Sequence, residues 1–142
     1  MIRESNAGSP PGILRRLAAM TYELLVLSAL LLVCLLLPHI VIGVFAHRVA
    51  TAVVLWGHFF IVLLVYFVWF WSHGGQTLAM KTWRIRLLTR DGQPVRPAQA
   101  LLRYLLCWPS LALGGIGILW AMVDRNGQFL HDRIAGTQLV KA

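Results

Sequence analysis

An acidic residue stands inside the first long apolar stretch of this chain. Leu17–Leu37 is a run of 21 residues in which Glu23 is the only charged side chain. At about 1.5 Å per helical residue the run is long enough to cross a hydrocarbon core of about 30 Å. A carboxylate at mid-membrane costs about 2.5–3.5 kcal/mol on insertion scales, so it normally faces protein or water. The fold must therefore provide Glu23 with polar surroundings.

Two further apolar stretches follow, Ala50–Trp71 and Leu101–Val123. The whole chain is 58% hydrophobic and 13% charged, whereas soluble domains average about 25% charged residues. This composition excludes an ordinary soluble domain and predicts an all-α integral membrane protein, a three-span helical bundle. We expect a flexible tail over residues 1–13 and one membrane domain over residues 14–142, with spans at about 17–37, 50–71 and 101–123.

The polar segment between the second and third stretches carries a strand pattern. Trp83–Leu88 alternates apolar and basic residues at period two, which predicts a half-exposed strand with Trp83, Ile85 and Leu87 on one face. Asp91-Gly92 follows and is typical of a hairpin turn. We therefore predict a short β-like cytoplasmic hairpin between spans two and three.

The net charge of +8 is concentrated at the ends of the apolar stretches. The tail carries Arg3, Arg15 and Arg16, and the loop after the second stretch carries Lys81, Arg84, Arg86, Arg90 and Arg96, whereas Arg48 stands alone between the first two stretches. Because basic flanks stay in the cytoplasm, we predict a multi-pass protein of the bacterial cytoplasmic (inner) membrane with a cytoplasmic N-terminus. Lipid headgroups are the expected partners of Arg84, Arg86 and Arg90. Nucleic acid is not expected, because no compact basic module is present.

The path of the third stretch admits two interpretations. Pro109 and Gly114-Gly115 interrupt it, and a bend there would keep the basic tail inside. Leu139-Val140 could then pair with the strand at Ile85–Leu88, and Asp132 could reach Arg84, Arg86 or Arg103. A straight span agrees with the length of the stretch and leaves fewer backbone groups to be buried by neighbouring protein. We therefore expect the straight span.

Four charged residues form the candidate site: Arg16, Glu23, Arg103 and Asp132. Arg16 and Glu23 are seven residues apart, so they share one helix face. Arg103 begins the third stretch at a similar depth to Glu23, so a Glu23–Arg103 salt bridge would satisfy both charges. The other interpretation makes Glu23 a site for protons or cations.

The histidines offer weaker signals. His58 lies inside the second stretch, where we expect a packed, hydrogen-bonded imidazole. His131-Asp132 lacks an identifiable nucleophile for triad catalysis and enough neighbouring ligands for a metal. Asp132 is instead expected to cap a helix beginning near Arg133, or to pair with Arg125 or Arg133. We predict no catalytic residue, no metal and no cofactor, and therefore no enzyme.

Several short motifs follow one another in a fixed order: Arg16-Leu17, Ala19 and Glu23, then Gly75-Gln76-Thr77-Leu78 followed by Lys81, then Asp91-Gly92, Leu102-Arg103, His131-Asp132-Arg133 and Ala135-Gly136-Thr137. Together they resemble the RDD family, a set of small membrane proteins, mostly bacterial, named for one Arg and two Asp. The resemblance covers roughly residues 14–141 and implies that the family's Arg is Arg16 and its second Asp is Asp132. Its first Asp falls on Glu23, which keeps the charge and adds one methylene.

The resemblance leaves the function open, because the activity of this family is mostly unassigned and some members are similar to sodium–proton antiporters. We predict a structural, assembly or interaction factor in the cytoplasmic membrane. Its expected partners are the lipid bilayer and either further copies of itself, in a homo-oligomer, or other membrane proteins. The alternative is a cation–proton antiporter that acts as an oligomer through Glu23.

Overall fold

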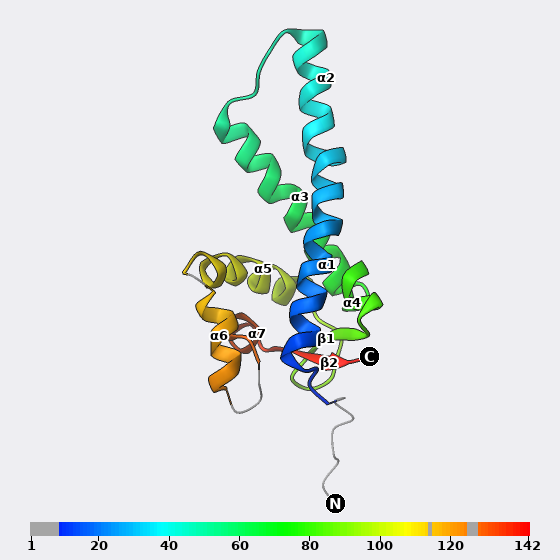
Figure 1. The fold of residues 1–142 in the computed structure, drawn as a ribbon, viewed down its shortest axis with the longest axis vertical. Helices are drawn as coiled ribbons and strands as arrows, with labels where there is room; N and C mark the ends of the chain where they lie inside the picture. Colours follow the sequence, from blue (N-terminus) through cyan, green and yellow to red (C-terminus); the bar gives the residue numbers. More distant parts are fainter. Residues whose placement is uncertain (1–8, 114, 125–127) are drawn as a thin grey trace, which may run out of the picture.

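Helices make up most of the structure (Figure 1). The structure is a computed structural model that describes residues 9–113, 115–124 and 128–142. In chain order the elements are α1 (Ile13–Leu31), η1 (Leu32–Leu36), α2 (Leu37–Ala46), α3 (Ala52–Ser72), α4 (Leu78–Thr82), β1 (Ile85–Thr89), α5 (Pro97–Ala112), α6 (Ile116–Val123), α7 (Leu130–Ala135) and β2 (Thr137–Lys141).

The first three elements form one continuous rod, Ile13–Ala46, of 34 residues. At 1.5 Å per residue the rod is about 51 Å long, well beyond a hydrocarbon core of about 30 Å. Its π-helical turn η1 lies just before Pro38, which has no N–H to donate to the carbonyl of Cys34. The π-helical turn accommodates the missing hydrogen bond: Leu37 N–H donates five residues back, to the carbonyl of Leu32.

The second long helix, α3, crosses α1 and diverges from the rod toward the α2 end (Figure 1). By length and composition the rod and α3 are both able to cross a membrane. Their outer surfaces carry exposed apolar side chains such as Val44 and Val53. The first two predicted spans therefore correspond to two candidate membrane-spanning helices.

The third apolar stretch does not form one straight span, so this expectation was wrong. Helix α5 ends at Ala112 and α6 begins at Ile116. Gly115, the N-cap of α6, has φ +78°, a left-handed conformation that breaks the helix at low cost only for glycine. Figure 1 shows α5 extending to one side of α1 and α6 turning away from the α2 end.

The two strands of the structure are far apart in the sequence but pair with each other. β1 and β2 are antiparallel, in a register that runs from Ile85 opposite Lys141 to Thr89 opposite Thr137. The predicted strand is confirmed from Ile85 onward, because Ile85 and Leu87 are buried while Arg86 is exposed. Trp83, predicted on the same face, is instead the exposed C-cap of α4. The predicted local hairpin is wrong, since the partner strand comes from the C-terminal tail.

The failure of the local hairpin has a simple chemical reason. The turn at Asp91-Gly92 is present, with Gly92 at φ +75°, but Pro94 and Pro97 follow it. A proline lacks the N–H that a strand ladder requires. β2 supplies an uninterrupted ladder instead.

The core lies at the sheet end of the molecule, where α1, α4, α5, α7 and the sheet gather (Figure 1). Gly75 shows how tightly this end is packed. Leu87 N–H donates to the Gly75 carbonyl at 2.7 Å, and a Cβ on Gly75 would lie 2.3 Å from the carbonyl oxygen of Leu87. The start of the chain joins this core too, since Lys141 N–H donates to the Ser9 carbonyl at 3.1 Å. Residues 1–8 of the expected tail lie outside the described residues.

Candidate functional site

The bend between α5 and α6 brings α7 to α5, and an ion pair joins the two helices. Arg103 Nε donates to Asp132 Oδ1 at 2.5 Å, with side chains 5% and 1% exposed. Burial by itself would lower the pKa of Arg103, but the Asp132 carboxylate outweighs burial and raises it. The guanidinium also lies 4.2 Å from the centre of the Trp71 ring, a cation–π contact with α3.

The second buried guanidinium comes from α1. Arg16 is 2% exposed and lies 5.2 Å from the centre of the Phe129 ring, just before α7. The Asp132 carboxylate acts electrostatically on both Arg16 and Arg103. The Arg103–Asp132 pair joins α5 to α7, and Arg16 brings α1 to the same cluster through its contact with Phe129.

Glu23 has different partners from those we predicted. Tyr66 Oη donates to Glu23 Oε1 at 2.7 Å, and Thr77 Oγ1 donates to Glu23 Oε2. Thr77 also caps α4, because its hydroxyl accepts the N–H of Met80 at 3.3 Å. The Glu23 carboxylate therefore joins α1 to α3 and α4.

The predicted Glu23–Arg103 salt bridge was wrong, and its failure follows from the bend. With α7 folded back under α5, Asp132 occupies the position beside Arg103. The expected role of Asp132 as a helix cap was wrong as well, because α7 begins after Phe129 without a side-chain cap. Arg133 instead pairs with Asp124, and Arg125 lies outside the described residues.

The rod is long enough to hold a candidate span that does not include Glu23. A span of about 20 residues counted back from Ala46 begins at Leu27. Glu23 then lies about 6 Å beyond that point, and Arg16 about 16 Å beyond it. For a span counted in this way, the carboxylate lies near its end, where polar partners reach it more easily than at mid-membrane.

His131 is a buried neutral imidazole. Burial lowers the pKa of His131 to about 4, an effect that Asp132 only partly opposes. The 3.8 Å distance between His131 Nε2 and Asp132 Oδ1 is therefore not an ion pair at neutral pH. Its other ring nitrogen, Nδ1, is buried and has no hydrogen-bond partner among the described residues.

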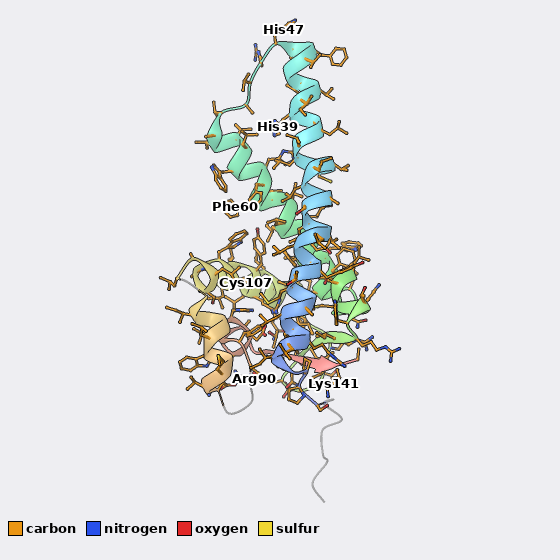
Figure 2. The ribbon with its side chains drawn as sticks, in the orientation of Figure 1. His39, His47, Phe60, Arg90, Cys107 and Lys141 are labelled. Atoms are coloured by element: carbon orange, nitrogen blue, oxygen red, sulfur yellow. The ribbon has the colours of Figure 1, made fainter. Side chains whose placement is uncertain are left out.

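A cavity of about 500 Å³ lies between α1, α3 and α5. Arg16, Glu23, Arg103 and His131 contribute polar groups to its lining, and most of the remaining lining is aliphatic or aromatic. Cys107, labelled on α5 in Figure 2, is part of this lining. The site is therefore an apolar cavity with charged groups gathered at the sheet end.

A second polar contact joins the two long helices near their other end. His39 Nε2 and His58 Nδ1 lie 3.0 Å apart and share a hydrogen bond between α2 and α3. His39 is labelled in Figure 2. The prediction of a hydrogen-bonded His58 is confirmed. Among the described residues no three His, Cys, Asp or Glu side chains gather as metal ligands do.

The three arginines predicted to meet lipid headgroups belong to the sheet end. Arg84 and Arg86 are exposed. Arg90 donates to the carbonyl of Arg133, so it also holds the sheet to α7. Contact with lipid stays a prediction for all three.

Sequence reasoning missed four residues of the site: Tyr66, Trp71, Thr77 and Phe129. Tyr66 and Trp71 of α3 resembled ordinary aromatic residues of a membrane helix. Nothing in the local sequence distinguishes a hydroxyl or an indole that forms a polar contact from one that does not. Thr77 did carry a signal, since a threonine just after Gly74-Gly75 and before an apolar turn is a good helix cap. We used that segment only as one of the motifs of the family resemblance.

Two exposed apolar helices, joined by polar contacts and anchored on a small α/β core, are typical of a helical integral membrane protein. The sequence model of the RDD family matches residues 10–136. The chain therefore belongs to the RDD family, as the motifs around Arg16, Glu23 and Asp132 predicted. No curated protein and no solved structure matches the chain.

Proposed function

We propose that this RDD protein is a structural, assembly or interaction factor of the cytoplasmic membrane. The observation that carries the proposal is the arrangement around Glu23, whose two oxygens accept hydrogen bonds from Tyr66 and Thr77. A carboxylate that transports ions must exchange its partners during each cycle. This one holds three helices in place, which favours a structural task over antiport.

The proposed topology places the rod and α3 across the membrane, with the N-terminus, the sheet and the C-terminal tail in the cytoplasm. Pairing of β1 with β2 supports a common side for the loop and the tail. Exposed basic residues at this end also support it, because cytoplasmic flanks carry Lys and Arg. Arg48, between α2 and α3, lies at the opposite end.

The proposed contact surface for partners is the α2 end of the two long helices. There α2 and the first turns of α3 stand apart (Figure 1), and Val44 and Val53 are 62% and 80% exposed. Helices that associate in membranes do so by packing and by interhelical hydrogen bonds. The partners are further copies of this chain or other membrane proteins.

Ion flux in liposomes separates this proposal from antiport. The purified protein would be reconstituted with a pH-sensitive dye inside and challenged with a sodium gradient. We expect no sodium-dependent proton flux above that of protein-free liposomes. Robust flux that Glu23→Gln abolishes and Asp91→Asn retains would overturn the proposal, because Asp91 is exposed on the turn and serves as the matched acidic control.

Site-specific photocrosslinking tests the contact surface itself. A photoreactive amino acid at Val44, on α2, should give a discrete adduct of higher mass in intact membranes. The same probe at Leu14, exposed at the other end of the rod, is the control and should not give that adduct. The interaction role fails if probes along α2 and the start of α3 give no adduct.

A further inference from the structure

The cavity between α1, α3 and α5 has an apolar body and a polar end. Its volume of about 500 Å³ falls within the range of small-molecule sites, roughly 300–1,000 Å³. Leu27, Phe59 and Leu63 belong to the apolar body, whereas Arg16, Arg103 and His131 lie at the sheet end. A ligand that matches both parts must itself be amphiphilic.

Two buried nitrogen atoms at the polar end have no hydrogen-bond partner among the described residues. They are Nε1 of Trp71 and Nδ1 of His131, whose residues are 3% and 5% exposed. Both side chains line the cavity. Buried polar groups nearly always have partners, and an indole N–H can only donate. The Trp71 indole therefore points to a ligand that supplies a hydrogen-bond acceptor, and His131 donates to the same ligand in the tautomer that carries its hydrogen on Nδ1.

The charges at this end favour an anionic acceptor. The guanidiniums of Arg16 and Arg103 line the cavity, whereas Asp132 does not. Glu23 also lines it, but both its oxygens already accept hydrogen bonds within the protein. A carboxylate is an acceptor-only group and forms short, strong hydrogen bonds with charged donors.

The shape of the cavity limits the size of the head group. Leu24 and Leu111 line the cavity and are 64% and 47% exposed, so it opens through an apolar rim. The opposite end is closed by buried Ile85, Phe129 and Leu139. This enclosed end suits a compact head better than a glycerophosphate with two chains.

We propose that this cavity binds a long-chain fatty acid, with the carboxylate at Trp71, His131 and the two arginines and the acyl chain along α1. In the proposed topology the ligand has the orientation of a lipid in the cytoplasmic leaflet, with its head toward the cytoplasm. It enters from the bilayer through the apolar rim.

Native mass spectrometry of the delipidated full-length protein tests the head group directly. The probes are oleate, oleyl alcohol and dioleoylphosphatidylglycerol. We expect one oleate per chain and about tenfold weaker binding of the alcohol, which cannot form the charge-assisted hydrogen bonds. Equal binding of oleate and alcohol, or preferred binding of the phospholipid, would overturn the proposal. This comparison uses only the wild-type chain.

Two tryptophan substitutions on the same helix test the location. Leu27→Trp fills the cavity and should abolish oleate binding. Leu25→Trp is the matched control, because Leu25 is 67% exposed and does not line the cavity. Oleate binding that survives Leu27→Trp in a folded protein would place the ligand elsewhere. His131→Phe should weaken oleate and leave the alcohol unchanged, and an equal loss of both would contradict the assigned role of the imidazole.

Discussion

Arg103 and Asp132 lie 29 residues apart in the sequence and form a buried ion pair between α5 and α7. The contact closes the fold, because α7 leads directly into β2 and β2 pairs with β1. Asp132 also acts on Arg16 of α1. The pair thus links the tail of the chain to the base of the first membrane helix.

Removing the acidic partner should destabilise the fold. Asp132→Asn leaves the buried guanidinium of Arg103 without its carboxylate, and breaking such a pair costs about 3–5 kcal/mol. We expect a fall of that size in the free energy of unfolding, measured by denaturant titration in detergent with tryptophan fluorescence. Asp91→Asn is the control and should stay within about 0.5 kcal/mol of the wild type. Equal stability of the two variants would contradict the structural role of Asp132.

Loss of the Tyr66 hydroxyl should destabilise the fold more than loss of the Tyr22 hydroxyl. Tyr66→Phe removes one hydrogen bond to the Glu23 carboxylate, and bonds to charged groups contribute about 1.5–3 kcal/mol. Tyr22 is 40% exposed on the same helix as Glu23, so Tyr22→Phe should have little effect. Thermal melts of both variants in the same detergent give the comparison, and a similar melting temperature for the two would count against the Glu23 arrangement.

His131 should make the protein less stable as the pH falls. Its pKa is about 4 in the folded state and about 6.5 in the unfolded state, so below about pH 6.5 the unfolded chain binds the proton first. The stability is complete above pH 6.5 and decreases toward pH 4, with a loss of roughly 2 kcal/mol at pH 5.

The measurement is the pH dependence of unfolding in His131→Phe. This variant should lose the part of the slope between pH 6.5 and pH 4 that His131 contributes. His73→Phe, at an exposed histidine, should keep the wild-type slope. An unchanged slope in His131→Phe would show that the imidazole is not kept neutral by burial.

Thiol labelling tests which side of the membrane the tail occupies. In a background without Cys34 and Cys107, Gln138→Cys places a thiol on β2 and Val49→Cys places one between α2 and α3. A membrane-impermeant maleimide applied to intact spheroplasts should label Val49→Cys and spare Gln138→Cys until lysis. Labelling of Gln138→Cys from outside would contradict the bend between α5 and α6.

Local pattern was enough to determine the class of protein and several of its elements. Apolar length predicted the first two membrane helices, since hydrophobicity and rise per residue act locally. Period-two alternation predicted β1 with Ile85 and Leu87 inside, and Asp91-Gly92 predicted the turn. The cost of a carboxylate in hydrocarbon required a polar partner for Glu23.

Only the tertiary structure decided which residues meet. The partners of Glu23, Tyr66 and Thr77, are 43 and 54 residues away in the sequence, and no local period encodes such a contact. The path of the third stretch also depended on distant packing. The local sequence allowed either a continuous helix or a bend, and the pairing of β2 with β1 together with the burial of Asp132 beside Arg103 selects the bend. Contacts of this kind are set by the whole chain, because each one stabilises the fold only once the others have brought its partner into reach.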